Sequence, residues 1–261
     1  YGDMEHSRIT EKPPGRKPVD TRAIPMSRLD EMIAAVKRAA AEGNQAYWVC
    51  PLVEESDVID LTAAEERFES LKAVLGDRVG LVHGRMSGPE KDAVMEKFYR
   101  GDLSVLIATT VIEVGVNAPN ATIMIIEHAE RFGLAQLHQL RGRVGRGDKK
   151  SSCILLYRPP LGETAKARLK VLRDTEDGFV IAEEDLRLRG AGDFLGAAQS
   201  GFPRFRLADI AVHGELLAAA RDDAKMIIDR DPELRTPRGQ ALRTLLYLFS
   251  REDAVKLLSA G

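Results

Sequence analysis

The sequence predicts an α/β fold, in which a mostly parallel β-sheet is sandwiched by helices and is followed by a C-terminal all-helical module. Up to Pro160, short runs rich in Ile, Val and Leu alternate with helical or turn segments, which is the pattern of buried parallel strands joined by crossover helices. After Pro159-Pro160 the chain has helical periodicity and no predicted strand. The 261 residues, 44% of them hydrophobic, suffice for one α/β domain and a smaller appendage.

The predicted elements follow from hydrophobic spacing and capping signals. The first helix covers 28–41, with Ser27 as a candidate cap, and a strand covers 46–53. Capping boxes at Thr62-x-x-Glu65 and Ser87-x-x-Glu90 each predict the start of a helix. The further strands expected are 79–82, 105–108, 121–126 and 153–157, and the later helices are 163–173, 180–189, 207–228 and 240–258, with a glycine-rich loop over 190–201.

The composition limits the classes of function. A formal net charge of −2 makes tight autonomous binding to nucleic acid unexpected, because that affinity tracks the number of phosphates neutralised. The sequence shows neither an apolar run of membrane-spanning length nor a signal peptide, so we expect a cytoplasmic location. Cys50 and Cys153 fall in predicted strands without a second ligand at metal-binding spacing, which predicts reduced core thiols and no metal site.

Basic residues cluster in one stretch of this near-neutral chain. On a continuous helix Gln139, Arg143 and Arg146 would fall at i, i+4 and i+7 and share one face. Two arginines this close need acceptors, which favours an external polyanion over the alternative of a solvated helix with snorkelling arginines. The same stretch also carries Arg131, Arg141, Lys149, Lys150 and Arg158, with Asp148 as its one acid.

A second polar pattern precedes this cluster. The apolar run that begins at Leu106 breaks into Thr109 and Thr110, followed by Gly115 and Asn117. Hydroxyls and then glycine, at the end of a buried strand, are typical of a site that presents donors to phosphate and lets the backbone approach it closely.

The order of these segments resembles the superfamily-two helicases. His83-Gly84, Thr109 to Asn117, and Gln139 to Arg146 are similar to motifs IVa, V and VI, which belong to the second RecA-like motor domain of such enzymes. More narrowly, residues 50–56 and 132–140 resemble the RecG family of branched-DNA helicases. Residues 185–201 resemble the TRG (translocation) motif, which that family shares with the transcription-repair coupling factor Mfd.

The resemblance implies a site for ATP and Mg²⁺ that is shared with a first motor domain. Arg143 and Arg146 match catalytic arginine fingers, which stabilise the charge of the transferring phosphoryl group. Gln139 matches a polar residue beside them, and Gly115 matches a glycine that lets the backbone approach the nucleotide. Asn117 stands where the family usually has the aspartate that contacts ribose, so the ribose contact has lost its charge.

The resemblance also implies contacts with DNA. Gly84, Arg85, Thr109 and Thr110 match residues that hold backbone phosphates, which position the duplex without reading its sequence. In the TRG-like segment the candidates for translocation are Arg187, Arg189 and Gln199. The alternative for the two arginines is an exposed helix end on which they pair with neighbouring acids.

Parts of a complete motor are not found in this sequence. It has no Gly-x-x-x-x-Gly-Lys-Ser/Thr phosphate loop and no buried strand that ends in an Asp-Glu pair, so we expect the chain to be inactive as an ATPase by itself. We therefore expect the C-terminal part of a longer enzyme. Its expected divisions are an interdomain linker over 1–22, RecA-like helicase domain 2 over 23–160, a helical hairpin and loop with the TRG motif over 161–206, and C-terminal helices over 207–261.

Three functional hypotheses follow. The first is a RecG-like helicase that branch-migrates or regresses stalled replication forks and Holliday junctions, acting with an upstream motor domain and a wedge domain of the same polypeptide. The second is the equivalent half of Mfd, whose resemblance to residues 50–56 and 115–121 is expected to be poorer. The third is a nucleic-acid-binding domain without catalytic activity.

Overall fold

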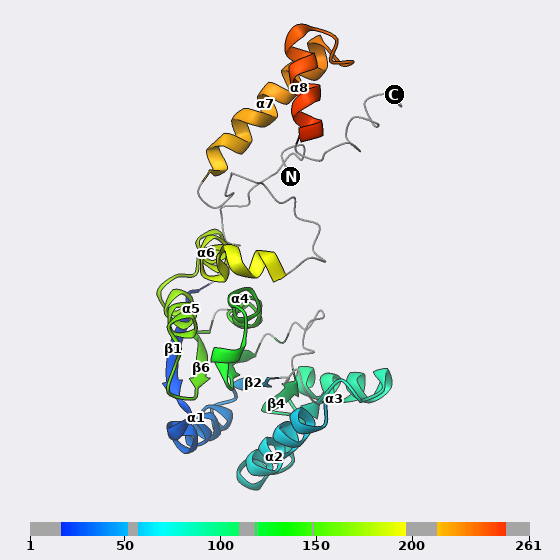
Figure 1. Ribbon diagram of the computed structural model, residues 1–261. Helices are drawn as coiled ribbons and strands as arrows, with labels where there is room; N and C mark the ends of the chain where they lie inside the picture. The colour runs from blue at the N-terminus through cyan, green and yellow to red at the C-terminus, as the bar shows by residue number, and fades with distance from the viewer. Residues whose placement is uncertain are drawn as a thin grey trace. The chain divides into compact units, whose positions relative to one another are not determined.

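The computed structural model describes residues 17–51, 57–109, 118, 120–147, 149–196 and 213–248. These residues belong to two compact units, which meet in sequence between Leu188 and Arg189 (Figure 1). The first unit holds the sheet and the helices around it, and the second holds the C-terminal helices.

The first unit is built on six parallel strands in the order β1-β6-β5-β2-β4-β3. This order confirms the predicted mostly parallel α/β fold. The strands are β1 (Val19–Pro25), β2 (Gln45–Cys50), β3 (Val79–Val82), β4 (Val105–Thr109), β5 (Ala121–Ile126) and β6 (Ser151–Tyr157).

Helices cover both faces of this sheet, because alternate strand residues point to opposite sides. Trp48 and Cys50 of β2 pack with α1 (Leu29–Ala41) and α2 (Asp57–Leu75). Tyr47 and Val49 pack on the other face. The helices of that face are α3 (Gly88–Arg100), α4 (Leu134–Arg141) and α5 (Glu163–Asp174), and short 3₁₀ turns lie at Met26–Arg28, Gly76–Arg78 and Ala129–Arg131.

Local signals explain several element boundaries. The predicted capping box of α3 is present, with Ser87 N donating to the Glu90 carboxylate at 2.8 Å. The helix ends at Gly101, whose φ of 86° is a conformation that glycine adopts without strain. The box at Thr62, by contrast, lies inside α2, which already begins at Asp57.

Two further predictions of local structure differ from the fold. Residues 19–22, placed in the linker, belong to edge strand β1, which runs parallel to β6 from Val19↔Ser151 to Pro25↔Tyr157. The predicted loop over 190–201 is helical up to Gly196, because α6 extends from Gly178 to Gly196. Glycine lowers the intrinsic helix propensity of a segment, but tertiary packing commonly outweighs that propensity.

The second unit contains α7 (Gly214–Arg230) and α8 (Pro237–Leu248). The turn between them is organised by Asp231, whose carboxylate accepts hydrogen bonds from the amide of Arg235 at 2.8 Å and from the amide and hydroxyl of Thr236 at 2.9 and 2.6 Å. A Cβ at Gly239 would lie 2.2 Å from the same carboxylate. The start of α8 therefore needs glycine at this position.

Candidate functional site

The segment that carries the two motif VI arginines is a turn rather than a helix. Helix α4 ends at Arg141, and Gly145 follows with a φ of 76°. A Cβ at Gly145 would lie 2.9 Å from Val19 Cγ2, so the chain passes close to β1 at this point. The expectation that Gln139, Arg143 and Arg146 share one helix face is therefore wrong, because α4 ends before Arg143 and Gly145 adopts a left-handed conformation before Arg146.

The turn nevertheless exposes a cationic side chain on a backbone that is anchored in the core. Val144, between the two arginines, is 0% exposed and belongs to the hydrophobic core. Arg143 is half-buried, whereas Gln139 and Arg146 are exposed. The Arg146 Nε donates to the Gly142 carbonyl at 3.4 Å. A buried valine thus anchors the turn, and the guanidinium of Arg146 is accessible to an anion from outside the chain.

Two tyrosines lie within electrostatic reach of these arginines. Tyr47 is fully buried, its ring centroid is 5.0 Å from that of Phe98, and its hydroxyl has no hydrogen-bond partner among the described residues. Burial raises the pKa of Tyr47, and the charges of Arg146 and Arg143 act in the opposite direction. Burial also raises the pKa of Tyr99, against the charge of Arg146. Sequence analysis did not identify these tyrosines, because they lie on β2 and α3, far from the two arginines in the sequence.

Arg141 has a different role from its neighbours. It is 3% exposed, and its Nη1 donates to the carbonyls of Leu172 at 2.6 Å and Thr175 at 2.8 Å. Its Nη2 is 3.1 Å from His138 Nδ1. Sequence analysis counted Arg141 only among the basic residues of this stretch, and the structure buries it as a clamp between α4 and the end of α5.

The predicted DNA-contacting residues gather at the carboxyl edge of the sheet. Thr109 ends β4, and His83 follows the neighbouring strand β3. Gly84 and Arg85, which follow His83, are exposed. The Thr109 hydroxyl is buried, and neither it nor His83 Nδ1 has a hydrogen-bond partner within the described chain. The structure therefore brings the described candidates, His83, Gly84, Arg85 and Thr109, to one edge, with two unsatisfied polar groups among them.

A buried ion pair, which sequence analysis missed, lies near the same edge. Glu127 follows β5, and its Oε1 is 2.5 Å from Arg67 Nε and 2.6 Å from Trp48 Nε1. The Arg67 guanidinium also lies over the Trp48 ring, 5.5 Å from the ring centroid. This cluster fixes α2 to the centre of the sheet.

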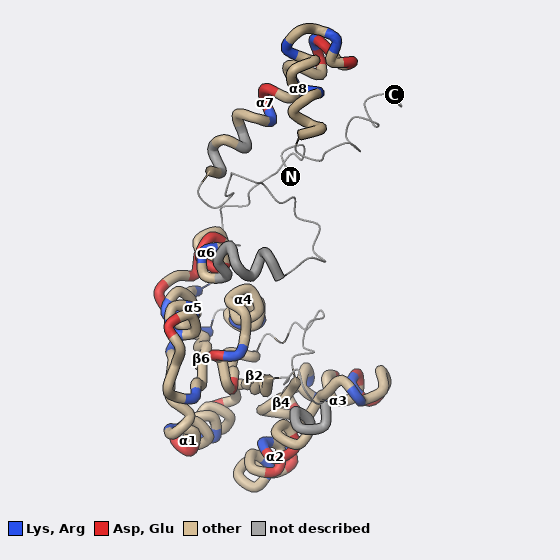
Figure 2. Tube along the Cα trace, in the orientation of Figure 1, with Lys and Arg blue, Asp and Glu red and all other residues tan. Residues whose placement is uncertain are grey.

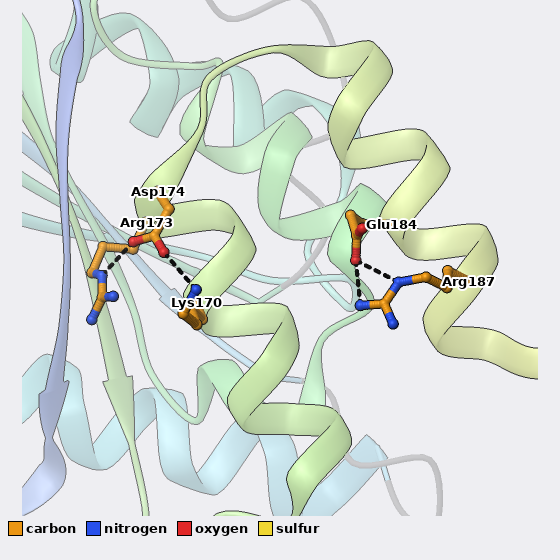
Figure 3. Close-up of polar contacts among 5 residues, drawn as sticks. All are labelled: Lys170, Arg173, Asp174, Glu184 and Arg187. Atoms are coloured by element: carbon orange, nitrogen blue, oxygen red, sulfur yellow. Dashed lines mark hydrogen bonds and ion pairs between the residues drawn. The ribbon is translucent and has the colours of Figure 1, made fainter.

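The candidate translocation residues are only partly described. Arg187 is exposed and forms an ion pair with Glu184 at 2.6 Å on α6, which is the pairing that the alternative interpretation expected (Figure 3).

On α5, a hydrogen bond from Arg173, with a second from Lys170, lowers the pKa of Asp174 (Figure 3). Acidic and basic residues occur together on α2 and α6 (Figure 2).

Several predicted site residues fall outside the described part of the chain. They are Thr110, Gly115, Asn117 and Gln199, and of Arg189 only the helical backbone is described.

The two cysteines are described, and both are free and buried, as predicted. Burial raises the pKa of Cys153 to about 12. Among the described helices, none is long and apolar enough to cross a membrane.

Comparison with known proteins adds an independent line of evidence. The family described as "Helicase conserved C-terminal domain" matches residues 26–148. The family described as "ATP-dependent DNA helicase RecG, domain 3, C-terminal" matches residues 175–253.

Curated relatives match over most of this chain but over only part of their own length. The ATP-dependent DNA helicase RecG of Acidithiobacillus ferridurans is 53% identical over 234 residues, which cover 89% of this chain and 34% of the relative. The protein of the same name from Escherichia coli (strain K12) is 53% identical over 235 residues, with coverages of 89% and 34%. That of Bacillus subtilis (strain 168) is 44% identical over 259 residues, with coverages of 98% and 38%. The chain thus spans about a third of the length of these relatives.

One solved structure also matches at substantial sequence identity. It is described as RecG bound to a three-way DNA junction, and it superimposes with a TM-score of 0.63 and 44% identity. The match covers 80% of this chain and 27% of the solved chain.

Proposed function

Since this chain belongs to the RecG family of helicases, as its motifs predicted, we propose that it forms the C-terminal motor half of an ATP-dependent DNA helicase. The proposed substrates are stalled replication forks and Holliday junctions, which the whole enzyme regresses or branch-migrates in recombination and repair in the cytoplasm. ATP and Mg²⁺ would bind between this half and an upstream motor domain, and a wedge domain of the same polypeptide would engage the branch.

The observation that supports this proposal most strongly is the turn after α4. Its buried Val144 and the positive φ of Gly145 fix the backbone, while Arg146 is exposed with a single long hydrogen bond at 3.4 Å among the described residues. An arginine finger needs this combination, because its side chain must reach an external phosphate from a backbone that is held in place. Arg143 and Arg146 are the proposed catalytic residues.

The remaining nucleotide contacts are assigned by motif. Gln139 is exposed one turn before the arginines, where its amide can donate to a phosphate or orient a guanidinium. Gly115 and Asn117, which follow β4 in the sequence, are proposed to contact the nucleotide. These residues would bind and orient the nucleotide, and a bound metal ion would supply the main neutralisation of phosphate charge.

DNA would be held at the carboxyl edge of the sheet. Gly84, Arg85, Thr109 and Thr110 are the proposed phosphate contacts, and the unsatisfied Thr109 hydroxyl supports the assignment because a buried hydroxyl without a partner costs about 1–3 kcal/mol. The proposed translocation residues are Arg187, Arg189 and Gln199.

The experiment that tests the proposal measures ATP hydrolysis, with and without branched DNA, by this chain alone and by the chain joined to its upstream motor domain. We expect hydrolysis only in the joined form, because a phosphate loop is needed from the upstream part. As a control, Arg38→Ala in the joined form, a substitution on the exposed face of α1, should leave hydrolysis unchanged. Absence of activity in both forms, with intact folding, would favour a nucleic-acid-binding domain without catalysis.

A further inference from the structure

Two unsatisfied polar atoms lie at the ends of neighbouring strands: His83 Nδ1 directly after β3, and the Thr109 hydroxyl at the end of β4. Thr109 is 2% exposed, and neither atom has a hydrogen-bond partner among the described residues. Most buried polar groups in folded proteins have a partner, and one without a partner destabilises the fold. The proposed DNA contacts include Thr109, but they give no role to His83.

The register of the sheet places the two side chains next to each other. Val82 of β3 is paired with Ala108 of β4 in the parallel ladder, so His83 and Thr109, the next residue along each chain, lie at the same level. Neighbouring strands are about 4.8 Å apart. The residue two positions before each of them packs in one hydrophobic cluster, so the alternation of side chains directs both groups to the same face of the sheet.

The charged side chains of the following loop and helix do not satisfy these two atoms. The Glu90 carboxylate accepts hydrogen bonds from the amide and the hydroxyl of Ser87, each at 2.8 Å. The Lys91 ammonium donates to the Gly84 carbonyl at 3.3 Å. Both residues lie near the start of α3, where they hold the loop that follows β3. A partner for the two unsatisfied atoms therefore has to come from outside the described part of the chain.

A phosphate of the DNA backbone fits this pair of atoms. Threonine hydroxyls are among the common donors to DNA phosphates, and an imidazole nitrogen that carries a proton is a donor as well. We propose that His83 and Thr109 bind one and the same phosphate, with the His83 Nδ1–H and the Thr109 hydroxyl as the two donors. The inference rests on the proposed function of this edge in DNA binding, and it adds His83 to the residues that hold the duplex.

Replacing His83 by Asn and by Gln tests the assignment to Nδ1, because the Asn amide can take the place of Nδ1 whereas the longer Gln amide cannot. In the full-length protein we expect the Kd for a forked DNA duplex to rise less than about threefold in His83→Asn. It should rise about tenfold in His83→Gln and in Thr109→Val, because a hydrogen bond to a charged acceptor is lost. Ser104→Ala is the matched control, since the Ser104 hydroxyl is also 2% exposed and unsatisfied but lies before β4, at the opposite end of the strand.

Replacing the phosphates of the fork one at a time by uncharged methylphosphonates shows whether the two groups share a phosphate. We expect one position at which the replacement weakens binding to wild type about tenfold, and at which His83→Gln and Thr109→Val have little further effect. Sensitivity of the two variants to different positions, or to none, would overturn the inference. Unchanged Kd values with a lower thermal midpoint would also overturn it, because they would indicate a water bridge within the fold.

Failure of the inference and failure of the proposed DNA site can be told apart with Arg85→Ala. If Arg85→Ala and Thr109→Val weaken DNA binding and His83→Gln does not, the inference is wrong and the proposed site stands. If none of the three substitutions weakens binding, the proposed site itself fails, and the inference with it.

Discussion

Arg141 and His138 lie on successive turns of α4, with the guanidinium Nη2 of Arg141 3.1 Å from His138 Nδ1. Because a guanidinium only donates, His138 Nδ1 accepts this bond and the neutral imidazole carries its proton on Nε2. The other end of the same guanidinium binds the carbonyls of Leu172 and Thr175. The helix that precedes the proposed arginine fingers is thereby fixed to the C-terminal end of α5.

Removing this clamp should destabilise the first unit. Arg141→Ala leaves two carbonyls and an imidazole nitrogen without their donor in a site where Arg141 is 3% exposed. We expect the free energy of unfolding to fall by about 2–4 kcal/mol, measured by urea denaturation. Arg38→Ala, at an exposed position, should change it by less than about 0.5 kcal/mol. Equal effects of the two substitutions would show that the clamp contributes nothing.

Gly145 should tolerate no side chain. Gly145→Ala places a Cβ 2.9 Å from Val19 Cγ2 on a residue with φ of 76°. We expect a loss of about 1–2 kcal/mol in unfolding free energy and a lower kcat in the full-length protein, because the turn that carries Arg143 and Arg146 must shift. Gly162→Ala is the matched control, since no atom lies within 4 Å of its Cβ position and its φ is −67°. A Gly145→Ala protein with normal stability and kcat would contradict the geometry of the turn.

The buried ion pair gives a prediction with a spectroscopic readout. Glu127→Ala removes the acceptor of the Trp48 indole and leaves Arg67, at 14% side-chain exposure, without its carboxylate. We expect a loss of about 3 kcal/mol in unfolding free energy. Trp48 is the one tryptophan of the sequence, so its fluorescence should report the change directly. Glu96→Ala, which removes an exposed pair with Arg100, should cost less than about 1 kcal/mol; a similar cost for both pairs would refute the expected difference.

The second unit should depend on pH through Asp231. Hydrogen bonds, first from the Thr236 hydroxyl, hold the pKa of Asp231 below its ordinary value of 3.8. A lowered pKa in the folded state means that the stabilisation is complete above the unfolded value and is lost as pH falls through the folded one. Wild type should therefore exceed Asp231→Asn in helix stability near neutral pH, and the difference should shrink as pH falls below about 4. Circular dichroism during urea titration measures it, and a difference that is independent of pH would rule out the carboxylate as the cause.

Elements with local signals could be predicted from the sequence. Strands 79–82 and 121–126 have the predicted bounds, and the Ser87 capping box starts α3. Strand β1 was missed because the proline-rich run before it indicated a linker. The alternation of buried Val19 and Thr21 with exposed Asp20 was the signal that could have identified an edge strand.

The environment of the candidate site could be predicted only in part. The motif separated Arg143 from Arg141, but it did not indicate that Arg141 is buried, because its acceptor, the carbonyl of Leu172, lies 31 positions away in the chain. Helix α6 continues through its glycines, and α4 ends already at Arg141. Both features depend on tertiary packing, which the spacing of residues in the sequence does not reveal.

The central claim is that Arg146 acts on the terminal phosphate of ATP. Its most direct test is the kcat of DNA-stimulated ATP hydrolysis for Arg146→Ala in the full-length protein, with DNA affinity measured in parallel. We predict a fall of about a thousandfold in kcat and unchanged DNA affinity, because the finger stabilises the transition state and does not hold the duplex. An unchanged kcat, or a loss of DNA binding that accounts for the lower rate, would contradict the claim.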